Sequence, residues 1–114
     1  MALNYNLAKV YAISDSDAAF AKQIVMLFLE EVPAEVKNLR EGLKEKDHNK
    51  VYSAAHKIKP TLDLLGMDLA YEDVVAIENW SKAKGKKKEI KDVVKNLREL
   101  VELTIKELKK DYNL

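Results

Sequence analysis

The spacing of apolar residues constrains the fold of this chain more than any other feature. Near the C-terminus, apolar residues and one threonine recur at alternating steps of four and three, at Ile90, Val94, Leu97, Val101, Thr104 and Leu108. Such a stripe forms one face of a long helix that packs in a bundle. Similar spacings occur in nearly every other segment, and no stretch alternates in the manner of a strand. The sequence therefore predicts an all-α protein.

Polar capping residues and helix breakers divide the chain into five predicted helices. Their boundaries are, in chain order, Ser14-Asp15-Ser16-Asp17, Pro33, Asp47, Gly66, Asp68 and Gly85. The first helix runs from the Ser-Asp stretch to about Glu31, and Pro33 lies in the first turn of the second. Because residues 24–29 are apolar on every side, we expect the first helix to contact neighbours on more than one side. The other four helices predict an antiparallel four-helix bundle, with the additional N-terminal helix across it.

Length and composition limit the classes of function. The 114 residues suffice for a single domain, residues 1–114, whose core needs neither metal nor disulfide. There is no cysteine, and the longest apolar run has six residues where a membrane span needs about 20. Twenty basic residues nearly balance 19 acidic ones. We therefore expect a cytoplasmic monomer whose partner is neither nucleic acid nor a membrane.

Two histidines carry what chemistry this chain offers, because it has no thiol and no glycine-rich phosphate loop. The predicted helix between Asp47 and Gly66 turns one apolar face to the core, and His56 lies on its solvent-accessible flank with Lys59 one turn further. A neutral imidazole there has a free lone pair and is a competent nucleophile. Taken alone, such a histidine is more often a solvated surface residue. His48 is out of register with His56, so we expect no metal site.

One stretch of the same helix carries a specific pattern, Ala55-His56-Lys57-Ile58-Lys59-Pro60, with Gly66 ten residues after the histidine. It resembles the signature of histidine phosphotransfer (HPt) domains, Ala-His-x-Leu/Ile-Lys-Gly followed by a glycine near that position. Members of that family are about this long and fold as a four-helix bundle with an extra N-terminal helix. The resemblance covers about residues 7–112, of which some ten in this helix are specific.

The resemblance implies a phosphorelay intermediate of two-component signal transduction. His56 would accept a phosphoryl group from a receiver-domain aspartate and pass it to another receiver, with Lys59 as the cation beside the phosphohistidine. Response-regulator receiver domains, including that of a hybrid sensor kinase, would be the partners. Such a phosphoprotein is a carrier without its own kinase activity, and it needs no cofactor because the receiver brings Mg²⁺.

Two positions depart from the family pattern. Pro60 replaces the small residue four positions after the histidine, and it cannot donate a hydrogen bond to the carbonyl of His56. Asp63 occupies a place where a small residue is common, and it either repels a phosphoryl group or pairs with Lys59. We expect the partner to dock on the surface formed by Tyr52, Ser53, Pro60, Asp63 and Leu64, although Leu64 is equally suited to burial against the first helix.

Two other functions remain open on these residues. One is a helical adaptor that docks a receiver or another partner without carrying phosphate, because Pro60 and Asp63 spoil the chemistry, and the other is an unrelated structural bundle. The lysines at positions 82, 84 and 86–88 surround Gly85, and we interpret them as a solvated turn, since nucleic-acid binding favours arginines and several aromatic platforms. We expect Trp80, Met26 and Phe28 to pack in or beside the core.

Overall fold

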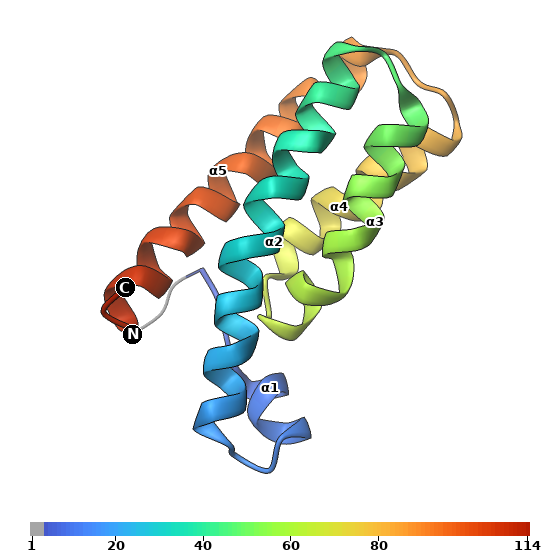
Figure 1. The fold of residues 1–114 in the computed structure, drawn as a ribbon. Helices are drawn as coiled ribbons and strands as arrows, with labels where there is room; N and C mark the ends of the chain where they lie inside the picture. Colours follow the sequence, from blue (N-terminus) through green and yellow to red (C-terminus); the bar gives the residue numbers. More distant parts are fainter. Residues whose placement is uncertain (1–3) are drawn as a thin grey trace.

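The computed structural model describes residues 4–114, which form five helices and no strand. The helices are α1 (Ala8–Ile13), α2 (Ala18–Lys44), α3 (His48–Leu64), α4 (Asp68–Lys82) and α5 (Lys87–Asp111). Short turns join them, so that successive long helices run in opposite directions (Figure 1). The all-α prediction is confirmed.

The four long helices form a ring in which each contacts two neighbours. α2 packs on α3, α3 on α4, α4 on α5, and α5 returns to α2. The short helix α1 packs against the N-terminal part of α2 at one end of the bundle (Figure 1). This arrangement is the predicted antiparallel four-helix bundle with an additional N-terminal helix.

The identity of the additional helix was predicted wrongly. No break occurs near Pro33, because the segments expected as two helices form the single helix α2 with this proline inside it. The additional helix is α1, which precedes the Ser14–Asp17 stretch and buries Val10 completely. A proline inside a helix costs about 3 kcal/mol. The buried stripe of α2 continues through this position, at Val25, Phe28, Val32, Val36, Leu39 and Leu43, and its burial outweighs that cost.

The apolar run in the N-terminal half of α2 is only partly enclosed. Phe28 is fully buried, as predicted, whereas Met26 and Leu27 are 44% and 43% exposed. The expectation that this segment contacts neighbours on more than one side agrees with the packing of α2 against α1, α3 and α5. The expectation that Met26 packs in or beside the core is wrong, since α1 and the bundle together cover only part of the helix. Trp80 lies half-buried beside the core.

The caps fix where the long helices begin. Asp17 accepts hydrogen bonds from the amides of Ala19 and Phe20, and Asp47 accepts one from the amide of Lys50, as the capping pattern predicts. Asp68 lies in the first turn of α4, and Met67 holds the N-cap position instead. Gly66 has a φ of +62°, and a Cβ there would meet Asn6, so a glycine is required at this turn.

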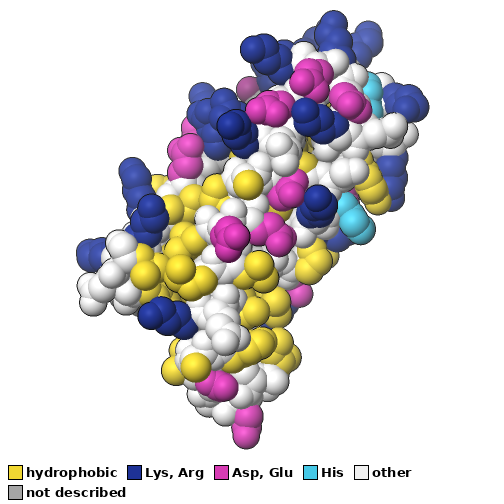
Figure 2. Space-filling model, in the orientation of Figure 1, with side chains coloured by type: hydrophobic (Ala, Val, Ile, Leu, Met, Phe, Trp, Pro, Cys, Tyr) yellow, Lys and Arg dark blue, Asp and Glu magenta, His cyan; other side chains and the backbone are white. Residues whose placement is uncertain are grey.

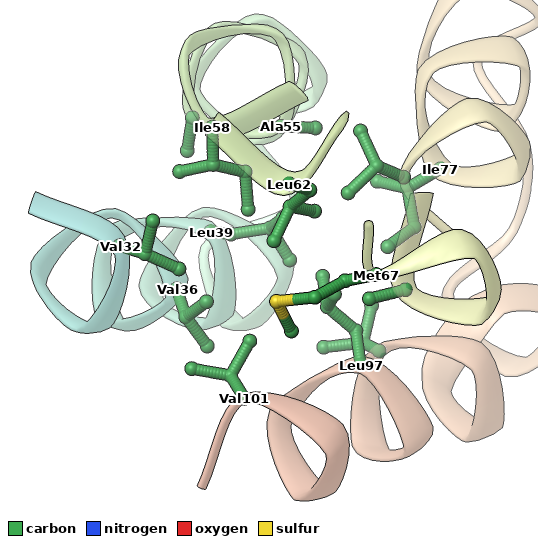
Figure 3. Packing of buried hydrophobic residues seen from close by; sticks show 14 of the residues in the cluster. Val32, Val36, Leu39, Ala55, Ile58, Leu62, Met67, Ile77, Leu97 and Val101 are labelled. Atoms are coloured by element: carbon green, nitrogen blue, oxygen red, sulfur yellow. The ribbon is translucent and has the colours of Figure 1, made fainter. Parts of the chain in front are cut away.

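The core lies along the axis of the bundle and receives side chains from all four long helices. Figure 3 shows Val32, Val36, Leu39, Ala55, Ile58, Leu62, Met67, Ile77, Leu97 and Val101 converging there. All six residues of the predicted C-terminal stripe are buried on α5. On α3, the buried residues Val51, Ala55, Ile58 and Leu62 fix the rotation of the helix. That rotation leaves His56 on the outside of the bundle.

Candidate functional site

His56 lies in the middle of α3, on the flank that faces α4. Its side chain is 61% exposed, while Ala55 beside it is buried in the core. The histidine is therefore anchored by the packing of α3 and remains accessible to a large partner. This placement agrees with the helical pattern of the sequence.

A buried carboxylate on α4 holds both predicted reactive residues. Nδ1 of His56 lies 2.8 Å from Oε2 of Glu78, and Nζ of Lys59 donates to Oε1 of Glu78 over 2.9 Å. The Glu78 side chain is only 6% exposed. One glutamate thus bridges the imidazole and the ammonium group, which brings the two side chains together on the surface between α3 and α4.

The carboxylate decides which ring nitrogen of His56 carries the proton. An ionised carboxylate only accepts hydrogen bonds, so the proton of the neutral imidazole lies on Nδ1 and points to Glu78. The lone pair is then on Nε2, for which residues 4–114 provide no hydrogen-bond partner. The site therefore presents an unprotonated ring nitrogen on an exposed side chain.

The charges of Glu78 and Lys59 stabilise each other. Burial alone would raise the pKa of Glu78, but the hydrogen bonds from Lys59 and His56 and their charges outweigh burial and lower it. The hydrogen bond to Glu78 in turn raises the pKa of Lys59. At neutral pH, Glu78 is a carboxylate and Lys59 an ammonium ion.

An aromatic contact supports the imidazole from the preceding turn of α3. The ring of Tyr52 stacks on that of His56, with 5.5 Å between centroids and 12° between planes. Nζ of Lys82, at the end of α4, lies 5.4 Å from the centroid of the Tyr52 ring. The stacking contact with Tyr52 restricts the orientation of the His56 ring in addition to the hydrogen bond with Glu78.

The residues expected in the docking surface differ in exposure. Ser53, Pro60 and Asp63 are exposed, whereas Tyr52 and Leu64 are half-buried, and Leu64 packs against the core. α3 continues through Pro60 to Leu64. The proposed Asp63–Lys59 pair does not form, because Asp63 bonds Lys9 of α1 at 2.6 Å.

Sequence reasoning missed Glu78, although a signal for it exists. Glu78 lies on the buried stripe of α4, among Val74, Ile77 and Ser81. A carboxylate at such a position must be paired, since an isolated buried charge is costly. A glutamate on the buried stripe of α4 therefore indicates a cation or hydrogen-bond donor on a neighbouring helix. His56 and Lys59 on α3 supply both.

The second histidine and the acidic side chains form no further candidate site within the described part of the chain. Within residues 4–114, no group of three or more histidine, aspartate or glutamate side chains lies in position to hold a metal ion. His48 hydrogen-bonds the carbonyl of Gly85 through Nε2 at 2.9 Å and contacts the ring of Trp80, so it serves the turn before α5. No helix in this part of the chain is long and apolar enough to span a bilayer.

Comparison with known families agrees with this geometry. The family model described as "Hpt domain" matches residues 23–110, which is most of the chain. Searches of curated proteins and of solved structures returned no match. Hpt domains are helical phosphocarrier modules, not kinases, and they interact with receiver domains during phosphotransfer in two-component signalling. This chain belongs to the histidine phosphotransfer (Hpt) domain family.

Proposed function

We propose that this protein is a phosphorelay intermediate in which Nε2 of His56 accepts a phosphoryl group from one receiver aspartate and passes it to another. The observation that carries the proposal is the hydrogen bond between Nδ1 of His56 and the buried carboxylate of Glu78. It leaves the nucleophilic lone pair on Nε2 of an exposed side chain. A histidine that was only a solvated surface residue would have no need of a buried carboxylate behind it.

The transfer step follows from this arrangement. The Nε2 lone pair attacks phosphorus, the bond between phosphorus and the aspartyl oxygen breaks, and the aspartate leaves with the electron pair. The imidazole gains positive charge and keeps its proton on Nδ1, where the Glu78 carboxylate stabilises it. Transfer to the next receiver is the same step in reverse, with that receiver's aspartate as the nucleophile.

Lys59 supports the phosphoryl group electrostatically. It shares the Glu78 carboxylate with His56, so its ammonium group lies beside the imidazole. Its side chain is 29% exposed, and its Nζ uses one of three donor protons on Glu78, so that the others are available to phosphoryl oxygens. Neutralising charge on those oxygens is the main task of a protein in phosphoryl transfer. The Mg²⁺ required is supplied by the receiver.

The receiver docks on α3 around His56. Ser53 and Pro60 are exposed on either side of the histidine along the helix, and Asp63 lies one turn further. Tyr52 and Leu64 add partly buried apolar surface at the two ends of this strip. Because Asp63 already pairs with Lys9, its negative charge is partly compensated and repels an incoming phosphoryl group less than a free carboxylate would.

The test is transfer from a phosphorylated receiver. The purified protein is incubated with phosphorylated receiver and Mg²⁺, and phosphate on the protein is located by mass and acid lability. We expect an acid-labile adduct on His56 that is absent in His56→Gln and present in His48→Gln, the matched control. If receivers bind but leave no phosphate on His56, the carrier function is wrong and the adaptor function is favoured.

A further inference from the structure

A second surface of distinct chemistry lies on the opposite side of the bundle from His56, between α2 and α5. A groove of about 660 Å³ is lined there by seven basic residues, Lys37, Arg40, Lys44, Lys87, Lys91, Lys95 and Arg98. We call it the basic groove. In the upper part of Figure 2, where α2 ends and α5 begins, many lysine and arginine side chains lie together. The net charge of +1 for the whole chain conceals this concentration.

The charges of the basic groove are largely uncompensated. Its only acidic lining residue is Glu41, which pairs with Lys50 outside the groove at 3.7 Å. Within residues 4–114, Arg98 is the one member of the seven with a carboxylate within 4 Å. Like charges that line one groove repel each other, which destabilises the unbound state. An anionic partner would relieve that repulsion.

Arg98 contributes a guanidinium group that is incompletely paired within the protein, on a side chain that is 33% exposed. Its Nε is buried and has no hydrogen-bond partner, and the nearest carboxylate oxygen, Oε1 of Glu102, is 3.8 Å away. A buried donor without an acceptor is costly and uncommon in native structures. A carboxylate is the acceptor that best fits the planar fork of a guanidinium group.

The basic groove also has apolar surface. Leu43 and Val94 contribute to its lining. A smaller hollow of about 110 Å³ shares Lys37, Arg40 and Arg98 with it, and its other lining residues include Pro33, Val36, Val101 and Ile105. In Figure 2, hydrophobic side chains lie next to the basic ones on this face. The surface therefore combines cationic side chains with an apolar floor.

We propose that the basic groove binds an acidic segment of a partner protein, with carboxylates on the lysines and arginines and apolar side chains on the floor. From Lys87 to Arg98 the groove follows α5 for about 16 Å, which matches three turns of a bound helix. Nucleic acid fits less well, because the lining has no aromatic residue for base stacking. A flat lipid surface fits a concave groove poorly.

The position of the groove gives this contact a role. α2 and α5 lie across the bundle from the surface between α3 and α4, so the acidic partner and a receiver at His56 would not compete for space. The protein can then be held by one partner while it exchanges phosphate with another. Binding at the groove does not require the transfer chemistry, so the two proposals are tested separately.

The probe is a fluorescein-labelled 14-residue synthetic peptide of glutamates with leucines at helical spacing, titrated by fluorescence polarisation at 50 mM salt. The double variant Lys91→Glu/Lys95→Glu is compared with Lys22→Glu/Lys110→Glu, which makes the same charge change outside the groove. We expect the groove variant to weaken binding at least about tenfold and the control less than about twofold. A peptide of the same composition with its leucines spread around the helix should bind more weakly than the probe.

Four outcomes would overturn the proposal: no binding of the peptide, equal loss in both double variants, equal binding of the rearranged peptide, or tighter groove-dependent binding of a 20-base-pair DNA duplex or phosphatidylserine vesicles. The last would assign the groove to nucleic acid or membrane instead. Circular dichroism checks that each variant is folded. The neutral variant Lys91→Gln/Lys95→Gln should also bind the peptide more weakly than the wild type, but by a smaller factor than Lys91→Glu/Lys95→Glu.

Discussion

Nδ1 of His56 and Oε2 of Glu78 lie 2.8 Å apart, although the two residues are separated by 22 positions and belong to different helices. The contact places a buried negative charge behind an exposed imidazole. It explains why a glutamate occupies the core-facing side of α4, where burial would otherwise disfavour it. It also ties the reactivity of α3 to the packing of α3 against α4.

Removing this carboxylate should slow phosphoryl transfer. A hydrogen bond to a charged group contributes about 1.5–3 kcal/mol, which corresponds to roughly ten- to hundredfold in rate. Glu78→Ala should therefore lower the rate of transfer from a phosphorylated receiver by about that factor, and Glu78→Gln, which keeps an acceptor but no charge, by less. Glu72→Ala, an exposed change on the same helix, is the control. A Glu78→Ala rate equal to that of the wild type would remove Glu78 from the mechanism.

Periodicity predicted the parts of this fold that depend on burial. The stripe on α5 and the apolar face of α3 are both as expected, because apolar residues at every third or fourth position share one face of a helix, which is then buried. Pro33 misled the prediction, since a local helix-breaking preference of about 3 kcal/mol is smaller than the burial of the stripe on either side. Only the tertiary packing decides that balance.

The candidate site was predicted only where its residues share one helix. His56 and Lys59 are one turn apart, so the sequence places them together. Glu78 and Lys9 reach the same region from α4 and α1, and no spacing along the chain reveals which helix faces are neighbours. The Asp63–Lys59 pair, one of two alternatives for Asp63, does not form for that reason, because the closer cation, Lys9, comes from a helix that was not predicted.

The charge of Lys59 should matter for phosphoryl transfer, whereas that of the nearby Lys57 should not. Lys59→Gln removes the ammonium group beside the imidazole and should reduce the transfer rate by about tenfold, the lower end expected for one charge-assisted contact. Lys59→Arg should retain most of the rate because it keeps the charge. Lys57→Gln is the matched control, since Lys57 pairs with Glu35 at 3.5 Å on the other flank of α3. If both glutamine variants transfer equally well, Lys59 has only a structural role.

Acid should weaken the fold partly through Glu78. Because its pKa is lowered in the folded state, Glu78 contributes stability above its ordinary value of 4.5, and this contribution is lost as pH falls through the lower folded value. Glu78→Gln should be less stable than the wild type at pH 7, and the difference should shrink as the pH falls below about 4.5. Urea unfolding of both proteins across this range measures the difference. A gap that stays constant with pH would contradict the assigned direction of the shift.

Pro60 should destabilise α3, because it lies inside the helix and leaves the carbonyl of His56 without its intrahelical hydrogen bond. Replacing an interior proline with alanine gains about 3 kcal/mol, and the freer unfolded chain offsets up to about 1 kcal/mol of it. Pro60→Ala should therefore raise the free energy of unfolding by about 2 kcal/mol, measured by urea denaturation. Ser53→Ala, an exposed change on α3 that removes no such constraint, should change it by less than about 0.5 kcal/mol. A Pro60→Ala protein no more stable than the wild type would mean that α3 already accommodates the proline without cost.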